Sequence, residues 1–425
     1  MSIIPHVKGW CPGALRPMES GDGLIVRLRV TGGILTTGKA RAIAQAAVDY
    51  GNGLIDLSAR ANLQIRGVTQ ESWPALIDAL ARHDLIDDDE ASESVRNVMA
   101  SPLAGLDPTA LIDITPAIHA LEHHLITTKA LHNLPAKFGF LIDDGGAFPI
   151  NNHGTDIGFE AVKSDHKINY AVRLAGTDQV ALIDPSALVT TADRLARLFI
   201  DAAHEHDKPL KRMSDLVARV SAPALFARVG LKHIIKDQKK STEAIPLGYQ
   251  IIEHFGFLGV ASPFGRWQAA TLDKLAACAD DHGVSSLRLT PWRAILLPGV
   301  IEKTSQQILS TLFDDVIMRG DDARLSIAAC SGAPACHHAR VETQKDALLI
   351  ADMIKAPSLS GIRLHVSGCE KGCAHPRSST AVLVGRDGHY DLVLEGKASD
   401  HPVMRGLEPS TARKRVAEFL NGVSL

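Results

Sequence analysis

Four cysteines toward the end of the sequence are spaced as ligands of a metal centre. Five residues separate Cys330 from Cys336, and, 32 residues further on, three separate Cys369 from Cys373. Four cysteine thiolates, brought together in pairs by the fold, are the usual ligands of a 4Fe–4S cluster. Glycines let the backbone approach such a cluster and donate N–H groups to its sulfurs. Three lie among these cysteines: Gly332, Gly368 and Gly372.

Two other interpretations of the cysteines stay open. Structural zinc usually takes cysteine pairs separated by two to four residues, and the wider separation of Cys330 and Cys336 argues against it. Four unrelated buried cysteines are the second alternative. Six cysteines in 425 residues are not a disulfide framework, which favours a reducing, cytoplasmic location. Cys278 is predicted to be a core residue, and Cys11 is left unassigned.

A second set of reactive side chains lies on a strand predicted at residues 57–67. Side chains alternate along a strand, so every second residue shares a face. One face is apolar: Ala59, Ala61, Leu63 and Ile65. The other is polar: Arg60, Asn62, Gln64 and Arg66. Because guanidinium groups suit forked binding of carboxylates, we interpret the polar face as a binding surface and not as an ordinary solvated one.

An internal repeat supports that interpretation. Residues 24–68 align with residues 256–300 without a gap, and self-similarity of this length indicates a duplicated structural unit. In the second copy, small or apolar residues replace the polar ones: Gly259, Ala261, Trp292, Ala294, Leu296 and Pro298. A cationic surface kept in one copy favours a function for it. The residues predicted to bind substrate are Arg27, Arg29, Arg60, Asn62, Gln64 and Arg66.

Each copy is predicted to fold as strand, turn, helix and strand. Apolar residues alternate with Arg27 and Arg29, which is typical of a half-buried strand. Residues 38–50 carry an apolar helical face and end at Gly51, a suitable capping residue. Residues 54–66 are predicted to return as a strand. A longer mixed segment follows each copy, so the order of units is A, B, A′, B′.

These patterns resemble the nitrite and sulfite reductase family over nearly the whole chain. The two cysteine pairs and the S-x-R-x-N-x-Q-x-R-G motif at residues 58–67 carry the resemblance. Within that family, residues 8–34 and the SPLAGLD motif at residues 101–107 are most similar to precorrin-3B synthases. The resemblance implies an α+β fold with a duplicated, nitrite/sulfite reductase-like architecture and pseudo-two-fold symmetry.

Four units follow from this resemblance. They are ferredoxin-like half-domain 1 at 1–80, sulfite-reductase-type α/β domain 1 at 90–225, ferredoxin-like half-domain 2 at 245–315, and sulfite-reductase-type α/β domain 2, with the cluster, at 320–425. The resemblance assigns catalytic roles to Arg60, Arg96 and Lys137. Sulfite reductases carry a second lysine two residues further on, where this sequence has Gly139. Losing that cation disfavours a small oxyanion substrate and suits a large polycarboxylate tetrapyrrole.

Precorrin-3B synthases imply oxygen-dependent hydroxylation and lactone formation on precorrin-3A in aerobic cobalamin (vitamin B12) biosynthesis. Useful oxygen chemistry on a closed-shell substrate needs a metal. A mononuclear non-haem iron is therefore expected beside the cluster, with candidate ligands His337, His338, His365, Glu370 and His375. The alternative is a sirohaem-dependent sulfite or nitrite reductase, whose Cys373 would bridge the cluster to haem iron. A non-catalytic electron carrier is a third alternative.

Composition narrows the partners. Net charge is −3, which implies no general nucleic-acid-binding surface. No apolar run reaches about 18 residues, so no membrane span is expected, and the start of the chain shows no export signal. These features agree with a cytoplasmic protein. No G-x-G-x-x-G motif follows a predicted strand, so electrons are expected from an external donor, a reductase or a ferredoxin.

Overall fold

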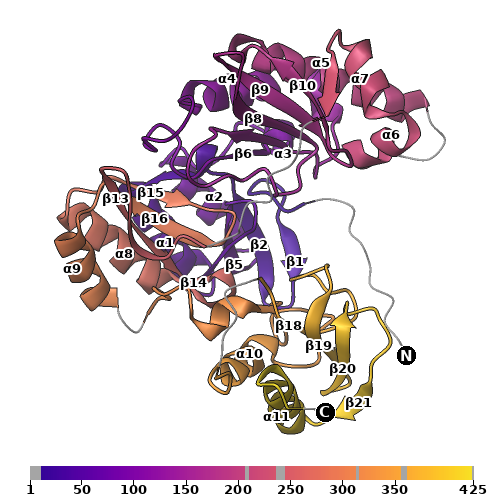
Figure 1. The fold of residues 1–425 in the computed structure, drawn as a ribbon. Helices are drawn as coiled ribbons and strands as arrows, with labels where there is room; N and C mark the ends of the chain where they lie inside the picture. Colours follow the sequence, from indigo (N-terminus) through magenta and orange to yellow (C-terminus); the bar gives the residue numbers. More distant parts are fainter. Residues whose placement is uncertain (1–10, 206–209, 236–244, 313–314, 356–360, 424–425) are drawn as a thin grey trace.

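A computed structural model describes residues 11–205, 210–235, 245–312, 315–355 and 361–423. The two copies of the repeat lie side by side at the centre (Figure 1). One outer domain, drawn in magenta, lies on one side of this centre, and a second, drawn in yellow, lies on the other. Residues 8–10, which contribute to the resemblance to precorrin-3B synthases, lie outside the described residues.

The two copies fold into matching elements, which confirms the predicted duplication and the helix at 38–50. The first copy contains β2 (Gly23–Leu28), β3 (Ile34–Thr36), α1 (Thr37–Tyr50), β4 (Leu54–Leu57) and β5 (Leu63–Val68). The second contains β13 (Phe255–Ala261), β14 (Arg266–Gln268), α8 (Ala269–Asp281), β15 (Ser286–Leu289) and β16 (Ala294–Pro298). Strands β1 (Met18–Ser20) and β12 (Gly248–Ile252) and helices α2 (Trp73–Ala81) and α9 (Glu302–Leu312) complete the two halves.

The halves exchange short strands. β3 pairs with β15 of the second copy, and β14 pairs with β4 of the first, so each five-stranded sheet needs both copies. The contacts are reciprocal: a Cβ at Gly33 would lie 2.7 Å from the Leu289 carbonyl oxygen, and one at Gly265 would lie 2.7 Å from that of Leu57. Both glycines have positive φ, a conformation that favours glycine. The expected pseudo-two-fold symmetry is thus present in the central unit.

The single strand predicted at 54–66 is wrong, although the predicted alternation holds from Ala61 to Ile65, where Ala61, Leu63 and Ile65 are buried and Asn62 and Gln64 only partly so. The chain forms two strands, β4 and β5, joined by a turn, because Ala61 adopts a φ of 54° and its N–H donates to the Ser58 carbonyl oxygen. The Ser58 hydroxyl accepts the N–H groups of Arg60 and Asn62, a bonding pattern that favours turns over strands. Ala59 is exposed. Arg60 and Asn62 therefore belong to the turn.

The outer domains share one arrangement of strands. The first has a six-stranded sheet of β6 (Val98–Ala100), β7 (Phe140–Asp143), β8 (Ile157–Ser164), β9 (Lys167–Leu174), β10 (Gln179–Ile183) and β11 (His233–Ile235). The second has five strands, β17 (Ile327–Ala329), β18 (Leu364–Ser367), β19 (Ser379–Arg386), β20 (His389–Gly396) and β21 (Met404–Leu407). In each, the first three strands are parallel and the fourth is antiparallel. β11 extends the first sheet past residue 225, the end predicted for that domain.

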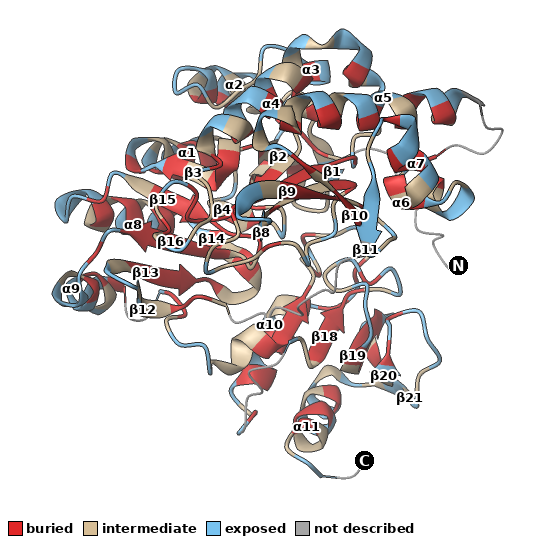
Figure 2. Cartoon of the chain, turned by 45° about the horizontal axis from the view of Figure 1, so that its top comes forward, coloured by how far each residue is buried: buried red, intermediate tan, exposed pale blue. Residues whose placement is uncertain are grey.

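Helices cover these sheets, whose strands are mostly buried (Figure 2). The first outer domain has α3 (Glu90–Val95), α4 (Thr115–Thr127), α5 (Leu188–Glu205), α6 (Met213–Arg219) and α7 (Ala222–Arg228). The second has α10 (Thr343–Ala351) and α11 (Pro409–Leu420). Each outer domain has its own apolar core. Among the helices that the structure describes, none is both long and apolar enough to cross a membrane.

Candidate iron–sulfur and anion-binding site

The cysteines lie where two neighbouring parallel strands end. Cys330 follows β17 directly, and Cys369 follows β18 after Gly368. The two strands pair in parallel, so their carboxyl ends meet at one edge of the sheet. The Cys330 N–H donates to the carbonyl oxygen of Val366 at 3.2 Å. Local strand pairing therefore places Cys330 and Cys369, one cysteine of each pair, at the same edge of the sheet.

The surroundings of the thiols fit a cluster. The Gly368 N–H donates to Cys330 Sγ at 3.1 Å, and a Cβ at Gly368 would lie 2.6 Å from a neighbouring side chain, so backbone closes tightly on this sulfur. Burial raises the pKa of Cys369 and of Cys373, and the charges of Cys330 and Cys336 raise both further. Four thiols that oppose one another's ionisation need added positive charge, which cluster iron would supply.

A site for one metal ion is a different matter. Within the described ranges, no group of three or more His, Cys, Asp or Glu side chains is placed to hold an ion. The expected mononuclear iron therefore has no ligand set within these ranges. Of its candidate ligands, His337 and Glu370 are exposed and His365 is fully buried.

The first outer domain keeps the same backbone arrangement without the thiols. Ser101 follows β6 as Cys330 follows β17, and the N–H of each donates to the neighbouring strand at 3.2 Å. The Ser101 hydroxyl accepts the Asp144 N–H at 3.0 Å, as Cys330 Sγ accepts that of Gly368. Hydrogen bonds from loop N–H groups to carboxylates then order this edge: Asp107, Asp143 and Asp144. The duplication therefore extends to the backbone around Cys330, and the first copy has a serine where the second has this cysteine.

Asp143, at the edge of the first outer domain that carries Ser101, makes the stability of the fold depend on pH. Its side chain is 0% exposed, and burial raises its pKa to about 6 despite N–H donors from Gly145 and Ile150. Because that value exceeds the unfolded value of about 3.9, the free energy of unfolding falls by about 3 kcal/mol in total between about pH 3 and about pH 7, most steeply between about pH 4 and about pH 6. Asp143→Asn should remove this fall in urea unfolding. Exposed Asp78→Asn should keep it, and an unaltered slope in Asp143→Asn would contradict the assignment.

The predicted cationic surface divides into two kinds of arginine. Arg27, Arg29 and Arg60 form the first kind: among the described residues none of them forms an ion pair, although the charge of the buried Glu93 acts on Arg27 and Arg29. Arg29 is 7% exposed, and its Nε and Nη1 have no hydrogen-bond partner there. Burial, with the charges of Arg27 and Arg96 adding to it, lowers the pKa of Arg29 to about 10. Burial likewise lowers the pKa of Arg27 and of Arg60.

Arg66 and Arg96 form the second kind, which is neutralised. Arg66 contacts Asp22 at 2.6 Å and Asp56 at 3.3 Å, and Arg96 contacts Asp87 at 2.8 Å. Burial alone would lower both arginine pKa values, but these bonds outweigh it and raise them. Both guanidinium groups are therefore already occupied by carboxylates of the chain. They are placed to hold the structure around the site.

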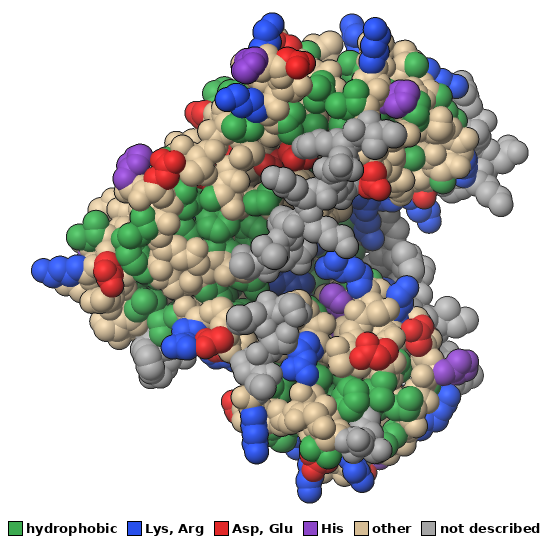
Figure 3. Space-filling model, in the orientation of Figure 1, with side chains coloured by type: hydrophobic (Ala, Val, Ile, Leu, Met, Phe, Trp, Pro, Cys, Tyr) green, Lys and Arg blue, Asp and Glu red, His purple; other side chains and the backbone are tan. Residues whose placement is uncertain are grey.

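Two arginines of the first kind, Arg29 and Arg60, line one narrow cavity together with Asn62 and Gly139. Arg96 and Glu122 line it too and form an ion pair at 3.4 Å. Four other predicted residues lie outside the cavity wall: Arg27, Gln64, Arg66 and Lys137. Gln64 accepts a hydrogen bond from Arg27, and the carbonyl oxygen of the exposed Lys137 accepts one from Arg60. Lysine and arginine side chains also gather on both sides of the hollow between the outer domains (Figure 3).

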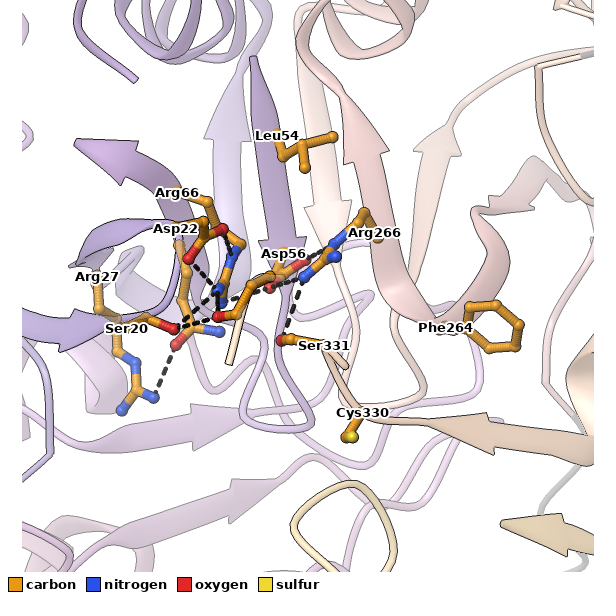
Figure 4. Close-up of polar contacts among 12 residues, drawn as sticks. Ser20, Asp22, Arg27, Leu54, Asp56, Arg66, Phe264, Arg266, Cys330 and Ser331 are labelled. Carbon is orange, nitrogen blue, oxygen red and sulfur yellow. Dashed lines mark hydrogen bonds and ion pairs between the residues drawn. The ribbon is translucent and has the colours of Figure 1, made fainter. Parts of the chain in front are cut away.

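Two residues of the site were missed by sequence reasoning. Arg266 binds Asp56 at 2.7 Å and the Ser331 hydroxyl at 3.3 Å, which ties the second copy to the cysteine loop beside Cys330 (Figure 4). The repeat could have revealed Arg266, because this charged residue aligns with an isoleucine in the first copy. Asn97 donates to the carbonyl oxygens of residues 136 and 138 and so fixes the segment around Lys137. Nothing in the sequence distinguishes this asparagine.

Comparison with known proteins places these features in a family. The Nitrite/Sulfite reductase ferredoxin-like half domain matches residues 16–83 and 253–312. The Nitrite and sulphite reductase 4Fe-4S domain matches residues 91–235, the outer domain that carries Ser101 in place of Cys330. The four cysteines lie outside the matched ranges.

Individual relatives agree with this match. A precorrin-3B synthase of Sinorhizobium is 30% identical over 93% of this chain and 84% of its own length. A ferredoxin–nitrite reductase of Synechococcus elongatus is 26% identical over 92% of this chain and 83% of its own. The solved structure of the Mycobacterium tuberculosis NirA protein superimposes with a TM-score of 0.75 over 94% of this chain and 81% of its own, at 19% identity. That likeness shows a shared fold.

Proposed function

The chain belongs to the nitrite and sulfite reductase family, and on that premise we propose that it is a precorrin-3B synthase. The proposed reaction hydroxylates precorrin-3A with molecular oxygen and closes a lactone, in aerobic cobalamin biosynthesis. One observation carries the proposal: Arg29, which is 7% exposed, and the half-buried Arg60 line one cavity, and within the described residues neither forms an ion pair with a carboxylate.

Unpaired buried cations are expensive, so their persistence needs a reason. A charged group removed from water normally pairs with an opposite charge. In this chain Arg66 and Arg96 do so, and within the described residues the three arginines of the first kind do not. A ligand with several carboxylates, held by forked hydrogen bonds, would supply the missing charge. A tetrapyrrole such as precorrin-3A has that chemistry, whereas a small oxyanion would neutralise one arginine at a time.

Gly139 supports a large ligand over a small one. A Cβ at Gly139 would lie 3.5 Å from Arg60 Nη1 and 3.4 Å from the Asn97 carbonyl oxygen. A longer side chain would crowd Arg60, and a lysine would add a second cation directly beside it. The glycine therefore leaves space next to the guanidinium group, at the position where sulfite reductases add charge.

Cys330, Cys336, Cys369 and Cys373 would hold the 4Fe–4S cluster. When bound, the cluster supplies a one-electron relay. Hydroxylation by dioxygen puts one oxygen atom into the product and releases the other as water, so two electrons and two protons must come from an external donor, which we take to be a reductase or ferredoxin. The arginines would orient the substrate carboxylates. The expected mononuclear iron finds no ligand set in the described ranges.

Metal analysis of anaerobically purified protein tests this proposal. We expect broad absorption in the blue-violet, equimolar acid-labile sulfide and cluster iron, and no haem bands. A haem-type spectrum, an extractable isobacteriochlorin, and reduction of sulfite or nitrite would instead establish the sirohaem-dependent reductase. Zinc without acid-labile sulfide would show that the cysteines hold zinc and not an iron–sulfur cluster.

A further inference from the structure

His365 is a buried polar side chain that the proposed reaction does not use. It lies on β18, four residues before Cys369, and its side chain is 0% exposed. Neither ring nitrogen has a hydrogen-bond partner among the described residues. Buried polar groups in proteins nearly always have one. The ring is therefore placed for a partner that the protein atoms do not supply.

The Cε1 edge of the ring lies beside Gly372, which stands between the two cysteines of the second pair in the sequence. Side chains alternate on β18, and the neighbours of His365 pack in the core under α10 and α11. His365 and Ser367 share the opposite face, where the Ser367 hydroxyl donates to the Cys369 carbonyl oxygen at 2.7 Å. A Cβ at Gly372 would lie 3.5 Å from His365 Cε1, the carbon between the two nitrogens. Gly372 directly precedes Cys373.

The duplicated domain offers an internal comparison. Leu141 on β7 occupies the position of His365 on β18, since each pairs with the second residue of the preceding parallel strand. Leu141 is 2% exposed and belongs to an apolar cluster. The domain without cysteines thus has an apolar side chain, and the domain with them has a histidine. The histidine therefore occurs in the outer domain that carries the candidate cluster cysteines, and a leucine takes its place in the other.

The ring is a neutral donor at physiological pH. Burial, with the charge of His375 adding to it, lowers the pKa of His365 to about 4. The two rings lie 6.1 Å apart and nearly perpendicular, an edge-on packing that leaves the His365 nitrogens free of His375. A neutral imidazole carries one N–H and one lone pair, so His365 has a single hydrogen to give.

We propose that His365 donates a hydrogen bond to a sulfur of the cluster or of Cys373, and so raises the cluster's reduction potential. The inference rests on the proposed function, because it requires the cluster. An N–H directed at cluster sulfur stabilises the additional negative charge of the reduced state. His365 is thus a positioning residue, which acts on electron transfer through the metal centre.

Redox titration of the holoenzyme tests this role. His365→Leu, which keeps the volume, should retain wild-type iron and sulfide but shift the reduction equilibrium about tenfold toward the oxidised state, roughly 59 mV downward for one electron. His365→Gln restores an N–H donor and should recover most of that shift. His401→Leu alters an exposed histidine of the same domain, away from the cysteines in sequence, and should leave the potential unchanged.

The other outcomes are decisive in the opposite direction. A less than twofold change in His365→Leu, with iron and sulfide retained, would overturn the inference. Loss of iron without sulfide would also overturn it, because His365 would then be a metal ligand. If His365→Leu does not fold, isotopically labelled histidine in the reduced wild type should show a weak nitrogen coupling to the cluster spin, and its absence refutes the bond. A wild type without any cluster fails the proposed function first.

Discussion

Cys373→Ser is expected to lose the cluster. Serine hydroxyl stays protonated near neutral pH, so it cannot replace a thiolate ligand. Iron should fall from about four atoms per chain to fewer than one, the blue-violet absorption should vanish, and turnover should fall to background. Measuring iron, sulfide and the visible spectrum on anaerobically purified protein tests all three.

Cys278→Ser is the matched control. Cys278 packs against the core of the central unit, and the same substitution there should leave iron content unchanged. Full retention of iron and absorption in Cys373→Ser would remove Cys373 from the ligand set. Equal loss in both variants would indicate general instability instead of a lost ligand.

Arg29→Met should weaken substrate binding while stabilising the fold. Losing a hydrogen-bonded charged contact costs about 1.5–3 kcal/mol, so affinity for precorrin-3A should fall roughly 10- to 100-fold. The apo-protein should gain about 1–3 kcal/mol of unfolding free energy, because a buried cation without a carboxylate partner is replaced by an apolar side chain. Equilibrium titration and urea unfolding measure the two effects, and the cluster spectrum should not change.

Arg66→Met is the contrasting variant. Arg66 is 3% exposed and paired with Asp22 and Asp56, so its loss leaves the half-buried Asp22 without its arginine, while Arg266 still binds Asp56, and should cost about 3 kcal/mol of stability. A destabilised Arg29→Met with unchanged substrate affinity would show that Arg29 serves the fold. Opposite signs in the two stability measurements would confirm that the site contains two kinds of arginine.

The duplication was readable from the sequence because apolar periodicity and glycine placement recur in both copies. The helix at 38–50 and the flanking strands follow from local patterns. The exchange of β3 and β14 between halves was not readable, since short strands acquire their partners only through tertiary packing. The strand predicted through residues 57–67 failed for a related reason: alternation continues across a turn when the Ser58 hydroxyl replaces ladder hydrogen bonds.

The residue types in the sequence indicated the candidate site, but only ion pairing in the structure divides its arginines into two kinds. Six residues were predicted to bind substrate, and nothing in the sequence distinguishes Arg29 from Arg66. Only tertiary structure places Asp22 and Asp56 against Arg66 and leaves Arg29 unneutralised. The four cysteines were easier to propose as cluster ligands, because their spacing and the glycines among them can be read from short stretches of sequence. His365 was visible as a histidine near them, and its buried, partnerless state was not.

Conversion of precorrin-3A under isotopically labelled dioxygen, with a chemical reductant, tests the central claim most directly. The account predicts a product that gains one oxygen atom, with the label from dioxygen, and a loss of this product in Cys373→Ser and, at low substrate concentration, in Arg29→Met. Unchanged precorrin-3A, together with turnover of sulfite or nitrite by the same preparation, would contradict it.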